Sequence, residues 1–170
     1  MDFRKLNLIT GWGVFLVATI VYVLTIEPTT SFWDTGEFIT TAYKLEIGHP
    51  PGAPLFMLLA RLFSMFVSTE TVPVAVNVLS AVSSSLTILF LFWTITHFGR
   101  KMALKGDDAN NNGKIIATMA AGVVGALAYT FSDSFWFSAV EGEVYAMSFL
   151  LWDAVLWSLL RWVWVSNWMY

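Results

Sequence analysis

Four long apolar segments alternate with polar segments along the chain. They cover residues 6–26, 72–98, 115–131 and 144–165. A helix of about 20 apolar residues, rising about 1.5 Å per residue, spans the ~30 Å hydrocarbon core of a bilayer. The pattern therefore predicts four transmembrane helices. A cleaved signal peptide shares the outline of the first segment, but this apolar run is long for one and no small-x-small cleavage site precedes Glu27.

Two shorter helices are predicted in the loop 27–71, between the first two spans. Residues 35–47 carry apolar side chains at positions i, i+4 and i+7, which is typical of an amphipathic helix on a membrane surface, namely Phe38, Ala42 and Leu45. Gly48 is placed to end that helix. Residues 55–67 are apolar but too short to span, so we expect a second interfacial or re-entrant helix there.

The basic residues indicate how the spans are oriented. Only Lys44 and Arg61 fall on the side of the loop 27–71, and the other seven fall on the opposite side, namely Arg4, Lys5, Arg100, Lys101, Lys105, Lys114 and Arg161. Positively charged loops stay in the cytoplasm. We therefore expect cytoplasmic termini, with the loops 27–71 and 132–143 together on the outer face.

The composition agrees with an all-α integral membrane protein. Hydrophobic residues make up 57% of the 170 residues and charged residues 12%, which is outside the globular range, so residues 1–170 are interpreted as one transmembrane module. Aromatic residues gather near the chain end, as at a membrane interface, namely Trp162, Trp164, Trp168 and Tyr170. The sequence has no cysteine, which excludes disulfides and thiolate sites. No basic patch interleaved with aromatic residues suggests nucleic acid binding.

Candidate chemistry concentrates in residues 31–54, which contain Asp34, Glu37 and His49. Asp34 and Glu37 are three residues apart, so at a helix start both carboxylates project from one face. Two interpretations are compatible with this spacing. The pair is a capping-box variant, with Asp34 as N-cap and Glu37 at N3, or an active-site pair, and both can hold at once because a capped helix start is a rigid mount for a catalytic carboxylate. No spacing here is diagnostic of a metal, so no cofactor is predicted, although an acidic outer face attracts divalent cations.

Other polar residues lie within the spans. Asn77, Ser80, Ser84 and Thr87 form a seam on the second span that is more typical of helix packing than of ligand binding. Asp153 lies ten residues into the last span, where a carboxylate suggests an ion or proton pathway.

Two motifs resemble a known family. Phe-Trp-Asp-x-Gly-Glu-Phe at 32–38 is followed by Gly-His-Pro-Pro-Gly-Ala-Pro at 48–54, and Ala-Val-Glu-Gly-Glu-Val-Tyr-Ala stands at 139–146. Together they resemble the N-terminal part of a bacterial multispanning membrane family of formerly unknown function. That family is related to animal protein O-mannosyltransferases and to the GT-C superfamily of glycosyltransferases.

The resemblance implies a function and roles. It suggests transfer of a sugar, such as mannose, from a polyprenyl-phosphate carrier to a protein or glycan hydroxyl, at the periplasmic face of a bacterial inner membrane. Asp34 and Glu37 match the acidic pair of the first outer loop, with Asp34 as general base and Glu37 as second carboxylate. His49 and Arg61 are candidates to contact the carrier phosphate, although for Arg61 a snorkelling side chain is an alternative. Glu141 and Glu143 of the second outer loop are further candidates for binding.

Two alternatives remain open beside this interpretation. GT-C enzymes have more than four spans, so we expect this chain to be the N-terminal part of a longer enzyme and to be inactive alone. A non-catalytic membrane subunit that binds a partner through its acidic outer loops is the first alternative. An ion pathway through Asp153 is the second.

Overall fold

The computed structural model describes residues 2–50, 52–106 and 110–166, with side chains described as far as residue 163. The regular elements in these ranges are all helical, as expected. They are α1 (Phe3–Leu24), α2 (Thr35–Lys44), α3 (Pro54–Ser64), the short 3-10 helix η1 (Thr69–Thr71), α4 (Val72–Ala103), α5 (Asn112–Thr130), α6 (Asp133–Val140) and α7 (Val144–Ser166). Of the expected aromatic chain end, Trp162 is exposed, and the side chains of Trp164, Trp168 and Tyr170 lie outside the described residues.

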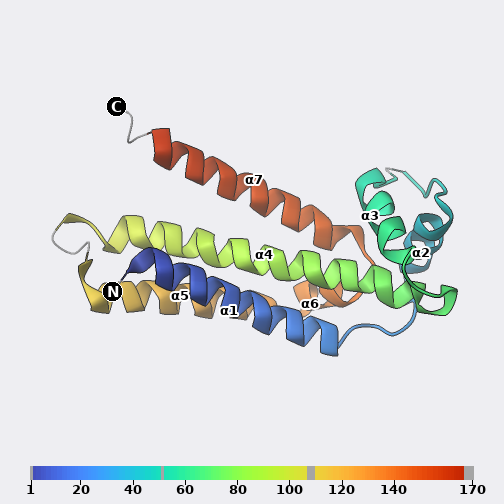
Figure 1. The fold of residues 1–170 in the computed structure, drawn as a ribbon, viewed down its shortest axis with the longest axis horizontal. Coiled ribbons are helices and arrows are strands. Elements are labelled where there is room, and N and C mark those ends of the chain that lie inside the picture. The colour runs from blue at the N-terminus through green and yellow to red at the C-terminus, as the bar shows by residue number, and fades with distance from the viewer. Residues whose placement is uncertain (1, 51, 107–109, 167–170) are drawn as a thin grey trace.

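Four of these helices, α1, α4, α5 and α7, are long and apolar enough to cross a membrane. This confirms the predicted all-α membrane fold. Helix α4 is the most buried of the four and packs against α1, α5 and α7, while α2 and α3 gather at one end of the bundle (Figure 1). Helix α7 inclines away from α4 toward its own C-terminal end, and the start of α1 lies at that same end of the bundle (Figure 1).

Small residues allow α5 to approach α4 closely. A Cβ atom on Gly122 would lie 2.7 Å from the Thr96 Cγ2 atom and 2.8 Å from the Phe92 Cε2 atom, so no larger residue fits there without a shift. Ala126, one turn further on, is fully buried. Helices in lipid associate mainly through such close packing, because lipid tails are as apolar as the side chains. Tyr22 of α1 joins this core, and its buried hydroxyl donates to the backbone carbonyl of Thr130, 3.0 Å away.

A second hydrophobic cluster fixes α2 and α3 against the first half of α4. Phe38 of α2 packs edge-on against Phe56 of α3, with ring centroids 6.0 Å apart. Val76 and Leu79 of α4 belong to the same buried cluster. The polar loop between α1 and α4 therefore rests on a packed base, which holds its side chains in defined positions.

The end of α2 differs from the sequence-based boundary. The expected helix 35–47 stops at Lys44, because Leu45 takes a left-handed conformation with φ of 55° and the amide of Glu46 donates to the carbonyl of Thr41. This turn sends the chain back toward the start of α2. Gly48 is therefore not the residue that ends the helix, as the sequence suggested.

Other boundaries also differ. The expected helix 55–67 is α3, which begins at Pro54 because proline fits the first helical turn. The loop 132–143 contains the helix α6, whose Phe135 and Ala139 are four residues apart and both buried in the core beside Tyr22. The first span starts earlier than expected, since the Asp2 carboxylate caps the amide of Arg4 at 2.9 Å.

Candidate functional site

Asp34, Glu37 and His49 come together at the end of the bundle formed by α2 and α3. The Oε2 atom of Glu37 lies 3.0 Å from the Nδ1 atom of His49, and the Oε1 atom accepts the backbone N–H of His49 at 2.7 Å. On the other side of the ring, the Nε2 atom of His49 lies 3.9 Å from the Oδ2 atom of Asp34. The sequence suggested this grouping, and the structure brings all three side chains into contact range.

The capping-box interpretation is wrong for this pair. Asp34 occupies the N-cap position of α2, but its side chain makes no capping hydrogen bond, and its backbone is itself helical. Both carboxylate oxygens of Glu37 bind His49 instead of reaching back to the helix start. The acid pair therefore does not cap the start of the helix. Of the Asp34 side chain, 59% is exposed to solvent.

Glycine residues let the loop 45–53 fold back onto α2. A Cβ atom on Gly48 would lie 3.1 Å from the Oε1 atom of Glu37, so glycine allows the backbone to reach the carboxylate. Gly52 has a φ of 82° and its amide donates to the carbonyl of His49 at 2.9 Å, which closes a tight turn after the histidine. These positions fix where the imidazole lies relative to Asp34.

The contact between Glu37 and His49 changes the proton affinity of both groups. The backbone N–H and then the ring of His49 lower the pKa of Glu37, and the hydrogen bond and charge of Glu37, with a smaller contribution from Asp34, raise the pKa of His49. Glu37 is therefore ionised near neutral pH, and a larger fraction of His49 carries a proton than an isolated histidine would. The imidazole of His49 is therefore held by one carboxylate and faces a second.

A second group of polar residues connects the two outer loops. The hydroxyl of Thr35, fully buried, lies 3.3 Å from the Oε1 atom of Glu143, and the hydroxyl of Ser31 lies 3.1 Å from that of Thr35. Burial raises the pKa of both Glu141 and Glu143, and the hydroxyls of Ser31 and Thr35 oppose this effect. Glu141 is 5% exposed, so it lies inside the loop structure rather than at its surface.

Asn77 of α4 anchors the first outer loop. Its Nδ2 atom donates to the backbone carbonyls of Glu27 at 2.7 Å and Thr29 at 3.2 Å. The side chain of Asn77 is fully buried, and Gly142 of the second loop packs against its Oδ1 atom. Sequence reasoning assigned Asn77 to a helix-packing seam and missed this role, as it also missed Ser31 and Thr35, because the partners lie far away in the sequence.

Arg61 lies on α3 and contacts Tyr43 rather than the Asp34, Glu37 and His49 group. Its guanidinium donates to the backbone carbonyl of Tyr43 near the end of α2 and lies over the Tyr43 ring, 5.4 Å from the centroid. Among the contacts between described residues, none joins Arg61 to Asp34, Glu37 or His49. Its position fits a side chain that fastens α3 to α2.

Three side chains of the site are suitably placed for a cation. Asp34, Glu37 and His49 each offer a ligand atom, and these atoms lie within 4.8 Å of one another. Carboxylate oxygens and imidazole nitrogens suit several divalent metals. Both oxygens of Glu37 already accept or share a hydrogen bond with His49.

Comparison with known proteins gives a consistent family. Residues 34–167 match the family described as the protein O-mannosyl-transferase TMEM260 N-terminal domain. A protein O-mannosyl-transferase tmem260 from Dictyostelium discoideum is 30% identical over 137 residues, which are 79% of this chain and 15% of the relative. Protein O-mannosyl-transferase TMEM260 from Mus musculus is 28% identical over 136 residues, which are 80% of this chain and 17% of the relative.

The comparisons also define how far the likeness extends. The chain spans less than a fifth of the length of these two relatives. No solved structure matches it. The matched segment begins at Asp34 and contains Glu37, His49, Glu141 and Glu143. Since this segment covers most of the chain, the protein belongs to the family of the protein O-mannosyl-transferase TMEM260 N-terminal domain.

Proposed function

We propose that this chain forms the catalytic-loop module of a GT-C-like glycosyltransferase. The reaction moves a sugar, such as mannose, from a polyprenyl-phosphate carrier to a hydroxyl of a protein or glycan. The observation that carries the proposal is the exposed Asp34 carboxylate, which caps no helix and faces the imidazole of His49 at 3.9 Å. Two relatives named as protein O-mannosyl-transferases support the reaction class.

Asp34 is the general base in this proposal. An acceptor hydroxyl is a weak nucleophile until a base removes its proton in the transition state, which contributes roughly 10²- to 10⁴-fold to the rate. Both oxygens of Glu37 bind His49, whereas Asp34 remains open to solvent on one side. Asp34 is therefore better placed to accept a proton, and Glu37 serves to orient His49.

His49 is the candidate contact for the carrier phosphate. The leaving group of the reaction is already a phosphate, so it needs stabilisation of its charge more than a proton. When it is protonated, the imidazole held by Glu37 supplies a positive charge and an N–H donor beside Asp34, and the contact with Glu37 favours this form. Arg61 would contribute to the carrier phosphate only after leaving Tyr43, so we assign it to loop structure rather than to the reaction.

Glu141 and Glu143 support the site from the second outer loop. Glu143 reaches the start of α2 through Thr35, next to Asp34 in the sequence. The charge of Asp34 contributes to the raised pKa of Glu143, which indicates that the two carboxyl groups influence each other. We propose that they position the acceptor and the first loop.

An apolar groove suits the carrier chain. It has a volume of about 500 Å³ and lies between α3 and α4, and its lining includes Leu62, the residue that follows Arg61 in the sequence. An isoprenoid tail is wholly apolar and needs such a surface along the membrane side of the site. The groove supports a lipid-linked donor rather than a soluble sugar nucleotide.

The proposed orientation places the site outside the cytoplasm. The starts of α1 and α5 and the ends of α4 and α7, which carry most of the basic residues, lie at the opposite end of the bundle from α2 and α3 (Figure 1). By the positive-inside rule that basic end is cytoplasmic. In a bacterium the site would then face the periplasm from the inner membrane.

The test is a transfer assay on the full-length gene product that contains this chain. Membranes with the protein receive polyprenyl-phosphate mannose labelled in the sugar, and label in protein is measured against membranes without it. We expect label in protein that depends on the gene product. Binding of a protein partner without any label transfer would support the non-catalytic subunit and refute the proposal.

A further inference from the structure

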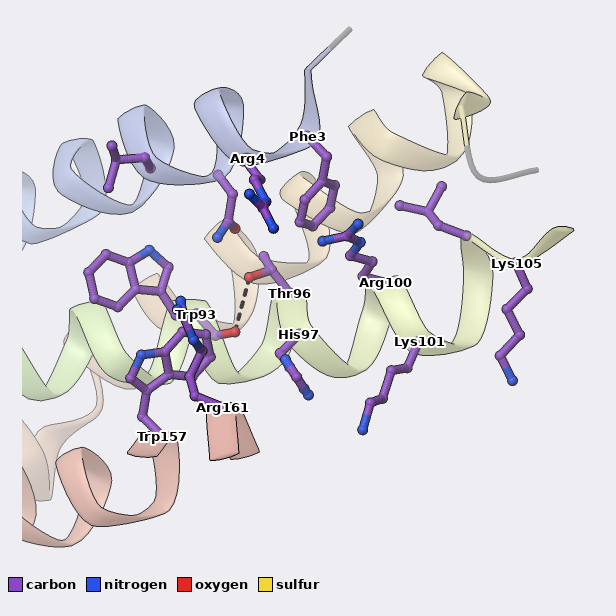
Figure 2. Close-up of a pocket in the computed structure, with 13 residues that line it drawn as sticks. Phe3, Arg4, Trp93, Thr96, His97, Arg100, Lys101, Lys105, Trp157 and Arg161 are labelled. Carbon is purple, nitrogen blue, oxygen red and sulfur yellow. Dashed lines mark hydrogen bonds between the residues drawn. The ribbon is translucent and has the colours of Figure 1, made fainter. Parts of the chain in front are cut away.

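A cavity lies at the end of the bundle opposite to Asp34. It has a volume of about 640 Å³ and is lined by α1, α4 and α7, where α7 inclines away from α4. Figure 2 shows the side chains around this space, namely Phe3 and Arg4 of α1, Trp93, Thr96, His97, Arg100 and Lys101 of α4, and Trp157 and Arg161 of α7. The sequence motifs and the proposed reaction do not use it.

Among the described residues, five cationic side chains line this cavity and no acid does. They come from three helices and the segment that follows α4, namely Arg4, Arg100, Lys101, Lys105 and Arg161. The positive-inside rule explains why basic residues accumulate at this end, but it does not explain why they surround one cavity. Lys5 and Lys114 lie at the same end and do not line the cavity, so only some of the basic residues at this end surround it.

Two polar atoms in the cavity wall lack protein partners. The Oδ1 atom of Asn7 and the Nε2 atom of His97 are buried from solvent and make no hydrogen bond with the described part of the chain. A buried polar atom without a partner is destabilising, because it has lost its hydrogen bond to water. After a rotation of either side chain toward the cavity, a ligand with acceptor oxygens and hydroxyl groups would satisfy these atoms, since an amide oxygen accepts and an imidazole nitrogen either donates or accepts.

Aromatic residues form the remaining wall. Trp93 of α4 stacks on Trp157 of α7 with ring centroids 5.8 Å apart, and the ring of His97 meets Trp157 edge-on at 5.9 Å. The guanidinium of Arg100 lies over the ring of Phe3, 4.9 Å from its centroid. A cavity with apolar walls and a basic mouth at the level of the helix ends matches an amphiphile at the membrane surface better than a free anion.

We propose that this cavity binds the phosphate headgroup of an anionic phospholipid from the leaflet opposite to the Asp34 site. The phosphate oxygens meet Arg4, Arg100 and Lys101, and headgroup hydroxyls bind Asn7 and His97 once these side chains rotate toward the lipid. The glycerol and first methylene groups lie against the two tryptophans. Bound lipid joins α7 to α1 and α4 at the end where α7 diverges from the bundle.

The test compares lipid binding by the wild-type chain and two double variants of equal charge. Phosphatidylglycerol and phosphatidylcholine are titrated onto the purified chain in detergent, and bound lipid is counted by native mass spectrometry. The first variant, Arg4→Gln with Lys101→Gln, removes two cavity charges. The second, Lys5→Gln with Lys114→Gln, removes two charges at the same end outside the cavity. Melting curves check that both variants fold.

We expect tight binding of one phosphatidylglycerol and weak binding of phosphatidylcholine. At ~1 kcal/mol per basic residue near an anionic lipid surface, the cavity variant should bind phosphatidylglycerol about 30-fold more weakly, and the control variant less than about threefold. Equal losses in the two variants, or equal binding of the two lipids, would overturn the proposal. Displacement of phosphatidylglycerol by inorganic phosphate at a similar concentration would identify a free-anion site and overturn the lipid assignment.

Discussion

Replacing Asn77 by alanine tests whether α4 holds the first outer loop in place. Asn77 is fully buried and donates two hydrogen bonds, at 2.7 and 3.2 Å, to the carbonyls of Glu27 and Thr29. Each such bond contributes about 0.5–1.5 kcal/mol net, so the variant should lose about 1–3 kcal/mol of stability. For a chain of this size that corresponds to a fall of about 2–12 °C in melting temperature.

Ser84 provides the matched control on the same helix. It is also fully buried, but its hydroxyl has no hydrogen-bond partner among the described residues, so Ser84→Ala removes an unsatisfied polar atom. We expect this change to be neutral or slightly stabilising. Both variants are melted in the same detergent with tryptophan fluorescence as the signal. An Asn77→Ala variant that melts with the wild type, or a Ser84→Ala variant that falls equally far, would refute the anchoring role.

Three further predictions concern the site, the topology and the helix packing. Glu37→Gln should lower the pKa of His49 toward its ordinary value of 6.5, because Glu37 is the main cause of the raised pKa. The pKa is followed by NMR of the imidazole, and an unchanged value would argue against the contact. The contact between Glu37 and His49 should stabilise the wild type fully between about pH 4.5 and 6.5, which are the ordinary pKa values of the two groups. This stabilisation is lost as pH rises through the raised pKa of His49 or falls through the lowered pKa of Glu37. The difference in melting temperature between the wild type and Glu37→Gln should therefore shrink outside that window. Cysteines at Thr40 and Asn111 should react with an impermeant reagent from opposite sides of the membrane, and labelling from one side would contradict the orientation. Gly122→Ala should lower the free energy of unfolding by about 1–3 kcal/mol in a melting experiment, since its Cβ atom would lie 2.7 Å from the Thr96 side chain of α4. An unchanged melting curve would mean that α4 and α5 move apart at little cost.

The spans were predictable because each is a long apolar run, which few other structures can accommodate. Helix α6 was not predicted, since a helix of 8 residues is too short to produce a clear periodic signal. The end of α2 was also missed, because a left-handed Leu45 has no sequence signature and results from the return of the chain toward Glu37.

The site was predictable in part. The spacing of Asp34 and Glu37 placed two acids on one helix end, and the motif around His49 suggested the histidine. The sequence could not tell that Glu37 binds His49 rather than capping α2, since that contact joins residues twelve positions apart through a turn. Thr35 and Glu143, which are 108 residues apart, meet only in the folded chain.

The most direct test of the proposed function is sugar transfer by the full-length protein with Asp34→Asn. Asparagine keeps the size of aspartate and removes its ability to accept a proton. Because the Asp34 side chain makes no capping bond, the change should alter stability by less than about 1 kcal/mol. Glu46→Gln, the same change at an exposed acid of the same loop, is the control. We predict that Asp34→Asn lowers the rate by about 10²-fold or more with an unchanged melting curve, while Glu46→Gln transfers sugar like the wild type. Transfer by Asp34→Asn at the wild-type rate would contradict the assignment of Asp34 as the general base.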